Sequence, residues 1–328
     1  MTTFDNRIAV VTGGGTGMGR ALTRQLAAAG AEVAICDVSA ETMAETAALC
    51  AAEVPGRRIT THLCDVSVEA QIEAFRDAVA SEHDTEHIHL LFNNAGIGGG
   101  GSFVTDARAD WDKTFGVCWS GVYYCSRAFL PMLIAADAAH LVNTSSVNGL
   151  WASLGPNIAH TAYSAAKFAV RGFSEALIND LHLNAPHVKV SVVMPGHIGT
   201  SIGTNTQKVL GKPAPMDLSA AEVAIARRRI EQQGVDTTRS TDDDIRAALA
   251  ERARSFLEDA PLTADEAATR ILEGVRAERW RILVGDDADA IDQAVRSTPD
   301  QAYEESFVER LQEEGRFWRL GHPARVSG

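Results

Sequence analysis

The stretch Ile8-Ala-Val-Val-Thr-Gly-Gly-Gly-Thr-Gly-Met-Gly19 decides the fold of this chain. Its apolar start, Ile8–Val11, is typical of a strand that is buried on both faces of a parallel sheet. From Thr16 to Ala29 apolar residues recur about every four positions, which predicts a helix that ends at Gly30. Glycines between such a strand and such a helix let the backbone approach a pyrophosphate, and the helix start offers free N–H groups and a positive dipole end. The stretch therefore predicts a dinucleotide-binding β-α unit.

Short β-rich runs alternate with helical stretches along most of the remaining chain. Further strands are expected at Val33–Cys36, Ile59–Leu63, Ile88–Phe92, Leu141–Val142, Val188–Val193 and Ile282–Val284. Because helical patterns separate most of these runs, the connections are expected to be right-handed crossovers. The predicted fold class is α/β, a doubly wound parallel sheet of the Rossmann type between two layers of helices.

The composition indicates a soluble, cytoplasmic protein. The chain has 328 residues, of which 45% are hydrophobic, and its 43 acidic and 30 basic side chains give a net charge of −13. Nucleic acid is therefore not expected as a partner, because binding phosphates needs clustered positive charge. Five cysteines without a C-x-x-C pair fit reduced thiols better than disulfides or a zinc site. No secretory signal and no membrane-spanning apolar run are visible, so no membrane contact is expected.

Three further segments extend the candidate cofactor site. Asp37 ends the second expected strand, 24 residues after Gly13, where a carboxylate can accept both adenosine ribose hydroxyls and repel a 2′-phosphate. This charge, and the non-basic residue at Thr16, predict NAD rather than NADP as the cofactor. Asp65-Val66 and Asn93–Gly96 follow the third and fourth strands, in places suited to the adenine and to the middle of the cofactor. The alternative is ordinary capping and turn chemistry at all three segments.

Tyr163 and Lys167 form a candidate acid/base pair. They lie four residues apart in a stretch with a helical pattern, which places them on one helix face. An unperturbed tyrosine titrates at about pH 10, and a nearby ammonium, with a cationic nicotinamide, favours the phenolate. The preceding strand ends in Ser145-Ser146, at the sheet edge where α/β proteins place ligands. A hydroxyl there can donate to a substrate oxygen, although capping alone would also explain a lone serine.

These motifs together resemble the short-chain dehydrogenase/reductase family. The matching segments keep the family's order over residues 5–286, and they are Thr12–Gly19, Asn93–Gly96, Ser145-Ser146, Tyr163–Lys167 and Pro195-Gly196. The resemblance implies seven parallel strands and hydride transfer to or from nicotinamide. It implies that Ser146 positions the substrate oxygen, Tyr163 transfers the proton, and Lys167 binds the nicotinamide ribose and tunes the tyrosine.

The resemblance and the residues together give a full set of candidate site residues. The catalytic candidates are Ser146, Tyr163 and Lys167. The candidate NAD-binding residues are Gly13, Thr16, Gly17, Met18, Asp37, Asp65, Val66, Asn93, Ala95, Gly96, Tyr163, Lys167, Pro195, Ile198 and Thr200, and no metal is expected. Because members of the family are usually tetramers and occasionally dimers, a homo-oligomer is expected, with a tetramer first.

Two features depart from the family pattern. Sixteen residues separate Ser146 from Tyr163, more than is common, and Ser146 is chosen over Ser145 by matching Ser-Ser-x-x-Gly. Cys118 stands where the family has an asparagine that holds a water of the proton relay. A thiol donates weakly and has no amide carbonyl, so an altered relay is expected. The alternative is that Cys118 is simply a small buried residue.

The chain is expected to contain a catalytic domain, residues 1–286, with an inserted helical lid at 201–261, and a C-terminal extension, residues 287–328. The extension either folds back or reaches a neighbouring subunit. The predicted activity is NAD(H)-dependent interconversion of a secondary alcohol and a ketone or aldehyde. The large lid favours a bulky apolar small molecule as the substrate. The alternatives are an acyl-carrier ketoreductase and a non-catalytic dinucleotide-binding regulator on the same scaffold.

Overall fold

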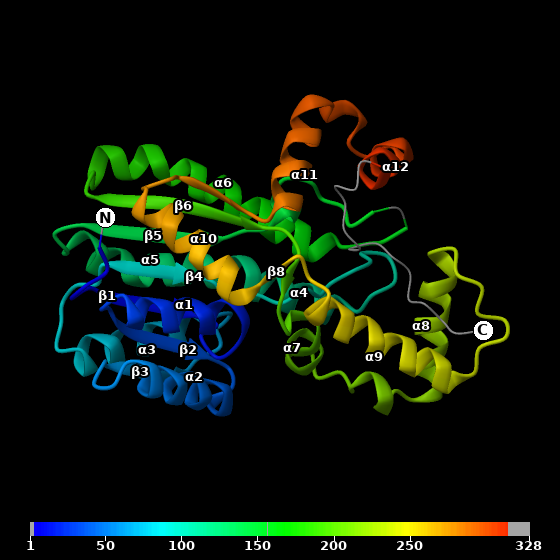
Figure 1. The fold of residues 1–328 in the computed structure, drawn as a ribbon, viewed down its shortest axis with the longest axis horizontal. Helices are drawn as coiled ribbons and strands as arrows, with labels where there is room; N and C mark the ends of the chain where they lie inside the picture. The colour runs from blue at the N-terminus through cyan, green and yellow to red at the C-terminus, as the bar shows by residue number, and fades with distance from the viewer. Residues whose placement is uncertain (1–2, 156, 314–328) are drawn as a thin grey trace.

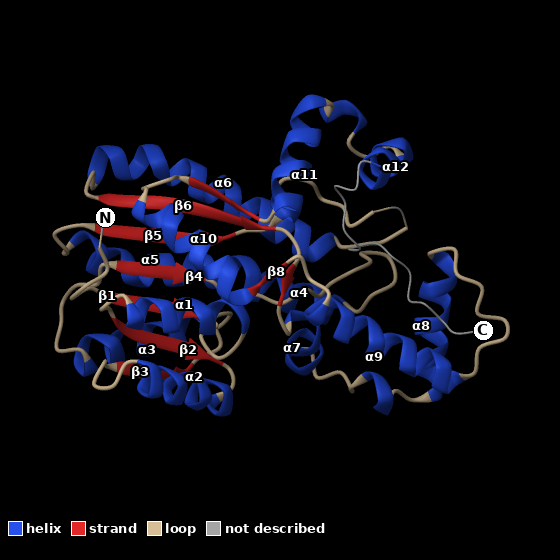
Figure 2. Ribbon diagram, viewed as in Figure 1, coloured by secondary structure: helices blue, strands red, loops and turns tan. Residues whose placement is uncertain are grey.

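One sheet of seven parallel strands forms the centre of the computed structural model, which describes residues 3–155 and 157–313 (Figure 2). The strands are β1 (Ile8–Thr12), β2 (Glu32–Asp37), β3 (Ile59–Leu63), β4 (Leu90–Asn93), β5 (Ala139–Thr144), β6 (Val188–Pro195) and β9 (Arg281–Val284). Their order across the sheet is β3-β2-β1-β4-β5-β6-β9. The chain thus winds outward from β1 in one direction and then in the other. The predicted doubly wound, seven-stranded parallel sheet is confirmed.

The helices follow the strands and cover both faces of the sheet. They are α1 (Gly17–Ala28), α2 (Ala40–Glu53), α3 (Glu69–Glu82), α4 (Arg108–Phe115), α5 (Gly121–Ile134), α6 (Thr161–Asn184), α7 (Ile202–Val209), α8 (Ala220–Gln232), α9 (Asp242–Glu258), α10 (Ala264–Arg276), α11 (Asp286–Ser297) and α12 (Glu305–Glu313). Four short turns of helix accompany them, at Gly116–Ser120, Val147–Gly149, Pro215–Asp217 and Pro299–Gln301. Within the described part of the chain, no helix is both long enough and apolar enough to cross a membrane.

Two apolar layers hold the helices to the sheet. Alternate residues of β1 point to opposite faces: Val10 joins the layer beneath α3, α5 and α6, whereas Ala9 and Val11 join the layer beneath α1, α2 and α10. All three side chains are fully buried. Strand β1 is therefore buried on both faces, which explains why its sequence is an unbroken apolar run.

The segment between the short strands β7 (Ile198–Gly199) and β8 (Leu262–Thr263) forms a helical arm, residues 201–261. Helices α8 and α9 pack on each other around Val223, Ile230 and Ile245, a small apolar cluster separate from the main core. The arm lies beyond the carboxyl ends of the strands (Figure 1). A capping box formed by Thr263 and Glu266 starts α10.

The C-terminal extension folds back on its own chain as far as it is described, to residue 313. The indole N–H of Trp151 donates to the carbonyl oxygen of Ala302 at 2.6 Å. The ring centroids of Trp151 and Phe307 are 5.4 Å apart, and Phe307 is fully buried. Trp151, in the segment between Ser146 and Tyr163, thus packs against α11 and α12. Residues 314–328 of the extension lie outside the described part.

Candidate active site

The glycine-rich turn between β1 and α1 packs tightly against two other loops. Gly13 and Gly17 have φ values of +68° and +52°, which favour glycine. A Cβ atom on Gly13 would lie 2.9 Å from the Cα of Ala95, and one on Gly17 would lie 3.1 Å from the Cγ2 of Thr200. The turn therefore brings the ends of β1, β4 and β6 together, and it places the candidate Gly13 beside Ala95 and the candidate Gly17 beside Thr200.

The start of α1 is open to an anion. Thr16 occupies the N-cap position, yet its side chain does not cap the helix and instead accepts a hydrogen bond from Asn205 at 2.9 Å. No acidic residue lies in the first turn of α1, and Met18 in that turn packs against the core. The first N–H groups of α1 thus remain available to a phosphate, and this local chemistry fits the pyrophosphate of a dinucleotide.

Asp37 lies beside the glycine-rich turn, at the end of β2. Its carboxylate accepts the backbone N–H of Gly15 at 3.0 Å and that of Ser39 at 3.2 Å. The N-cap of α2 is Ser39, whose hydroxyl accepts the N–H of Thr42, so Asp37 is a turn residue and not the cap. Each carboxylate oxygen retains a lone pair for a further donor. The position and charge fit an adenosine ribose.

Asp65 and Val66, at the end of β3, are engaged with protein partners. Asp65 forms an ion pair with Lys113 and accepts two hydrogen bonds from Ser67. Partial burial acts to raise the pKa of Asp65, but Lys113 and Ser67 outweigh this effect and the pKa is lowered. Val66 is buried against Gly121, and a Cβ atom on Gly121 would lie 2.7 Å from the Cγ2 of Val66. Lys113 is a neighbour of this segment that the local sequence pattern did not reveal.

The segment after β4 supplies backbone more than side chains to the site. The buried amide of Asn93 donates to the Oδ1 of Asn143 at 2.8 Å and so ties β4 to β5. The N–H of Ala95 donates to the hydroxyl of Thr12 at 3.0 Å. A Cβ atom on Gly96 would lie 3.5 Å from the Nζ of Lys167. Gly96 thus leaves room for the lysine.

The three catalytic candidates converge at the carboxyl end of β5. Tyr163 and Lys167 lie in the first two turns of α6, and the Nζ of Lys167 is 5.3 Å from the centroid of the Tyr163 ring. The ammonium of Lys167 donates to the carbonyl oxygen of Thr144 at 2.9 Å. The phenol of Tyr163 is within hydrogen-bonding reach of the Ser146 side chain. A substrate oxygen in contact with both Ser146 and Tyr163 would therefore meet two hydroxyl groups at once.

The two adjacent serines have different surroundings. The hydroxyl of Ser145 donates to the backbone carbonyl of Lys167 at 2.7 Å, so its proton is committed to holding β5 against α6. The hydroxyl of Ser146 accepts the N–H of Asn148 at 3.1 Å, which leaves its own proton free to donate. This geometry supports the choice of Ser146 over Ser145.

Burial sets the protonation of the tyrosine and the lysine. Burial raises the pKa of Tyr163, the Cys118 thiol adds to the rise, and the hydrogen bond with Ser146 opposes it. Burial also lowers the pKa of Lys167, and Cys118 opposes that shift. The sequence-based expectation that the ammonium lowers the tyrosine pKa thus does not describe the balance in this structure. The phenol is a proton donor at neutral pH, and it needs further positive charge nearby to act as a base.

Cys118 forms a closed pair with the backbone of Ile97. The thiol accepts the N–H of Ile97 at 3.4 Å and donates to the carbonyl oxygen of the same residue at 3.2 Å. Cys118 lies in the five-residue π-helical segment between α4 and α5, and it is fully buried. The single proton of the thiol is therefore occupied, which leaves no donor for a relay water at this position.

The loop after β6 carries the remaining cofactor candidates. Pro195 ends β6, and Ile198 is buried in the short strand β7, which pairs with Leu262 of β8. Thr200 extends from this loop toward Gly17. Of these candidates, Thr200 faces the glycine-rich turn, whereas Ile198 packs in the core layer beneath α1, α2 and α10.

Helix α7 joins the arm to this edge through two contacts that no local motif indicated. One is the bond between Asn205 and Thr16 described above, and in the other the hydroxyl of Thr206 accepts the N–H of Gly98 at 2.7 Å. The imidazole of His160 is also close, with its ring centroid 4.7 Å from that of Tyr163. Burial lowers the pKa of His160 to about 4, so the ring beside the phenol is neutral at neutral pH.

Comparison with known proteins places this fold and site in one family. The model of the short chain dehydrogenase family matches residues 7–210. The chain is 38% identical over 205 residues to the putative oxidoreductase SadH of Mycobacterium tuberculosis, a match that covers 62% of this chain and 71% of that protein. It is 35% identical over 200 residues to meso-2,3-butanediol dehydrogenase of Serratia marcescens, covering 61% of this chain and 74% of that protein.

Solved structures agree with this placement. A short-chain dehydrogenase/reductase from Burkholderia phymatum in complex with NAD superposes with a TM-score of 0.73 and 29% identity, covering 92% of this chain and 96% of that one. A metagenomic short-chain oxidoreductase in complex with NADP gives a TM-score of 0.52 and 32% identity, covering 59% and 84%. The chain belongs to the short-chain dehydrogenase family, and it is an oxidoreductase whose fold binds a nicotinamide dinucleotide.

The different roles of the paired serines predict different effects of their removal. Ser146→Ala is expected to lower kcat by about 10²- to 10³-fold, because it removes a donor to the reacting oxygen. Ser145→Ala is expected to lower the free energy of unfolding by about 1 kcal/mol and to leave kcat near the wild-type value. Absorbance of reduced nicotinamide and urea unfolding measure the two effects. If Ser145→Ala were the inactive variant, the assignment would be reversed.

Proposed function

We propose that this protein interconverts a secondary alcohol and a ketone or aldehyde with NAD(H), and that Tyr163 is the acid/base. The observation that carries the proposal is the meeting of Tyr163, Lys167 and Ser146 at the end of β5, beside the open start of α1. The family and the two relatives described above support an oxidoreductase. The alcohol and carbonyl chemistry follows from the paired hydroxyl groups.

Each catalytic candidate has one role in this proposal. In the direction of reduction, Tyr163 gives its phenolic proton to the carbonyl oxygen while Ser146 donates a hydrogen bond to the same atom. In the direction of oxidation, Tyr163 takes the hydroxyl proton. Lys167 would hold the nicotinamide ribose, and it stays fixed through its bond to Thr144. The cofactor supplies the hydride chemistry and, when oxidised, the positive charge that favours the phenolate.

Residues of the glycine-rich turn and the strand ends would hold the cofactor. The N–H groups at the start of α1 would bind the pyrophosphate, and the carboxylate of Asp37 would bind the adenosine ribose. Asp37 supports NAD, because its negative charge repels a 2′-phosphate. Thr16 is not a basic residue either, which also favours NAD over NADP. Since related folds are found with NAD and with NADP, this choice rests on Asp37.

We further propose that residues 201–261 act as a lid for a bulky apolar substrate. Two ion pairs hold the arm against the loop before α4 and the start of that helix: Lys212 with Asp110, and Arg229 with Asp106, each at 2.5 Å. In the same loop Phe103 is 76% exposed, and its ring lies near Trp111. Aromatic surface beside a closing arm suits an apolar ligand.

The acid/base role of Tyr163 has a direct test. Tyr163→Phe is expected to lower kcat/KM by about 10²- to 10⁴-fold across a panel of secondary alcohols, because the proton carrier is lost. The exposed Tyr123 offers a matched control, and Tyr123→Phe is expected to turn over like the wild type. The measurement is NADH formation by absorbance.

Equal turnover by Tyr163→Phe and the wild type would remove the proposed acid/base. Two results together would instead indicate a non-catalytic regulator. The wild type would bind NADH but turn over no substrate, and Lys167→Ala would leave the cellular phenotype unchanged. The closed pair of Cys118 with Ile97 is the structural feature that favours this second function.

The cofactor preference is testable without a substrate. Calorimetric titration of the wild type is expected to show at least about tenfold tighter binding of NADH than of NADPH, which corresponds to about 1.4 kcal/mol. Asp37→Ser is expected to narrow this gap, whereas Asp77→Ser, at an exposed site on α3, is expected to leave it unchanged. Tighter binding of NADPH by the wild type would contradict the role of Asp37 and favour an acyl-carrier ketoreductase.

We also propose that the protein is a homo-oligomer of the cytoplasm, a tetramer or a dimer, with no nucleic-acid or membrane partner. Along α6 an exposed stripe carries small and apolar residues at helical spacing, namely Ala165, Phe168, Gly172, Ala176 and Leu183. Small residues let a second helix approach closely, and a two-fold axis would pair this stripe with itself. The five cysteines are free and buried, which supports a reducing compartment.

The proposed contact along α6 predicts the effect of a charge within it. Phe168→Glu is expected to shift the sedimentation velocity of the protein toward a smaller species, because it buries an unpaired charge at the contact. Val104→Glu, at a loop residue that is 90% exposed, is expected to sediment like the wild type. A monomeric wild type at micromolar concentration would contradict the proposal.

A further inference from the structure

One hydrogen bond joins the loop after β6 to the C-terminal extension. The backbone N–H of His197 donates to the Oδ2 of Asp287 at 2.7 Å, across 90 positions of the sequence. Both residues are buried, with exposed fractions of 5% and 6%. His197 lies between Pro195 and Ile198, two of the candidate cofactor-binding residues. The bond therefore links the extension to a loop of the site.

The carboxylate of Asp287 occupies a socket built from two glycines. A Cβ atom on Gly196 would lie 2.1 Å from the Oδ1 of Asp287, and a Cβ atom on Gly285 would lie 2.3 Å from the same oxygen. Both distances are shorter than any allowed contact, so any other residue at either position would displace the carboxylate. Burial raises the pKa of Asp287, and the N–H groups of His197 and Ala288 act against this rise. The two glycines thus leave room for this carboxylate and hold it in one position.

Helix capping alone does not explain this arrangement. Asp287 lies in the first turn of α11, where its Oδ1 accepts the N–H of Ala288, and an acidic side chain is favourable there. The neighbouring Asp286 satisfies the same preference with a side chain that is 98% exposed. Only Asp287 turns inward, and its second oxygen binds the loop instead of its own helix. Burying a carboxylate is costly, so this contact needs a further reason.

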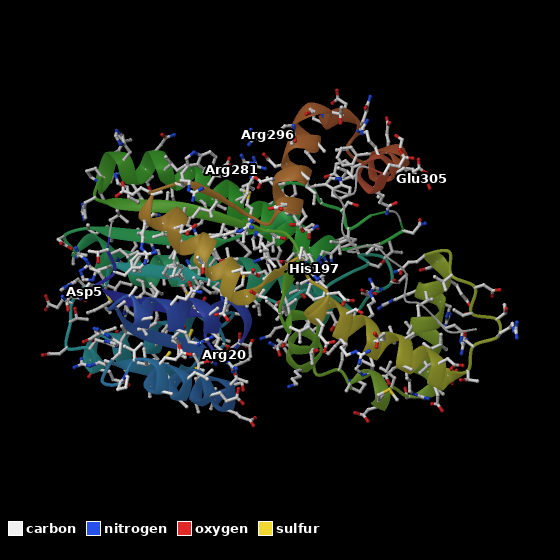
Figure 3. All side chains as sticks on the ribbon, in the orientation of Figure 1. Asp5, Arg20, His197, Arg281, Arg296 and Glu305 are labelled. Atoms are coloured by element: carbon white, nitrogen blue, oxygen red, sulfur yellow. The ribbon has the colours of Figure 1, made fainter. Side chains whose placement is uncertain are left out.

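The loop is also held from the side of the arm. The Nε2 of His197 lies 2.8 Å from the carbonyl oxygen of Phe256 in α9, and because a carbonyl only accepts, Nε2 carries the proton. The ring centroids of His197 and Phe256 are 4.3 Å apart. Figure 3 shows His197 where the end of the sheet meets the arm. The loop is therefore clamped between the extension and α9.

The extension also packs against the loop that carries Ser146. Val147 directly follows Ser146, and Val147 and Trp151 pack in one apolar cluster with Phe307. The bond from Trp151 to Ala302 closes this contact. The loop after β6 and the loop that carries Ser146 thus both contact residues 287–311, which lie beyond the last strand and beyond the region matched by the family model.

We propose that Asp287 is a positioning residue that fixes the loop at 196–200, and that the extension thereby completes the nicotinamide end of the site. The proposal rests on the proposed function, because that function needs the candidate cofactor-binding residues Ile198 and Thr200 of this loop. Asparagine at position 287 can accept only one of the two N–H groups that the carboxylate accepts. Asp287→Asn therefore loosens the loop without emptying the socket.

The test compares Asp287→Asn with Asp286→Asn in the full-length protein. In the protein without cofactor, amide hydrogen exchange of a peptide that contains His197 is faster in Asp287→Asn than in the wild type, and unchanged in Asp286→Asn. Fluorescence titration with NADH gives a Kd about tenfold higher for Asp287→Asn, which corresponds to about 1.4 kcal/mol. Asp286→Asn binds NADH like the wild type.

A second variant approaches the same bond from the other side. Gly196→Ala places a methyl group against Oδ1 and reproduces the faster exchange and the weaker NADH binding. If the two changes break one interaction, the double variant binds NADH no more weakly than Gly196→Ala alone. The Gly196→Ala variant also tests the proposal if Asp287→Asn does not fold.

Several results would overturn the proposal. Asp287→Asn with a lower melting temperature but wild-type exchange at His197 and wild-type NADH affinity would show that Asp287 only anchors α11. Additive effects in the double variant would show that Gly196 and Asp287 act separately. A wild type that binds no NADH would instead overturn the proposed function, while hydrogen exchange would still report whether Asp287 holds the loop.

Discussion

The close packing of the glycine-rich turn against the ends of β4 and β6 is the constraint on which the site depends. A side chain at Gly13 would collide with the backbone of Ala95, and one at Gly19 would lie 2.0 Å from the carbonyl oxygen of Gly13. Because these contacts leave no space, three strand ends that are far apart in sequence meet at one edge. The open start of α1, the carboxylate of Asp37 and the hydroxyl of Ser146 can then serve one extended ligand.

Burial at this edge controls the chemistry of the proposed acid/base. The ammonium of Lys167 finds its protein acceptor in the carbonyl oxygen of Thr144, and the phenol of Tyr163 stays protonated because burial disfavours its charge. A tyrosine held in this way keeps its proton at neutral pH. It can accept a proton only when positive charge lies nearby, so its basicity would depend on the oxidised, positively charged form of the proposed cofactor.

Two additions to the sheet converge on the loops of the site. The arm at 201–261 contacts the glycine-rich turn through Asn205 and the segment after β4 through Thr206. The extension contacts the opposite side through Asp287 and Trp151. The sheet alone thus fixes the strand ends, whereas the loops that follow them take their positions from helices outside the sheet. Variation in these helices can change the ligand without changing the fold.

Most of the fold could be predicted from the sequence because its signals are local. Apolar runs marked the seven strands, although β5 extends from Ala139 to Thr144 and not only over Leu141–Val142. The buried polar side chains of His140 and Asn143 hid its length, since each forms a hydrogen bond with a side chain of a neighbouring strand, His140 with Ser191 and Asn143 with Asn93. From sequence alone a polar residue is expected to be exposed, because its hydrogen-bond partner in a neighbouring strand is not visible.

The sequence by itself determined the doubly wound sheet, the glycine-rich turn, and the i to i+4 spacing of Tyr163 and Lys167, because each depends on residues close together in the chain. The tertiary structure decided which of two serines keeps a free proton, the ion pair of Lys113 with Asp65, and the return of the extension to the site. It also decided the direction of the Tyr163 pKa shift. These features depend on burial and on contacts between distant residues such as His197 and Asp287, which no local pattern encodes.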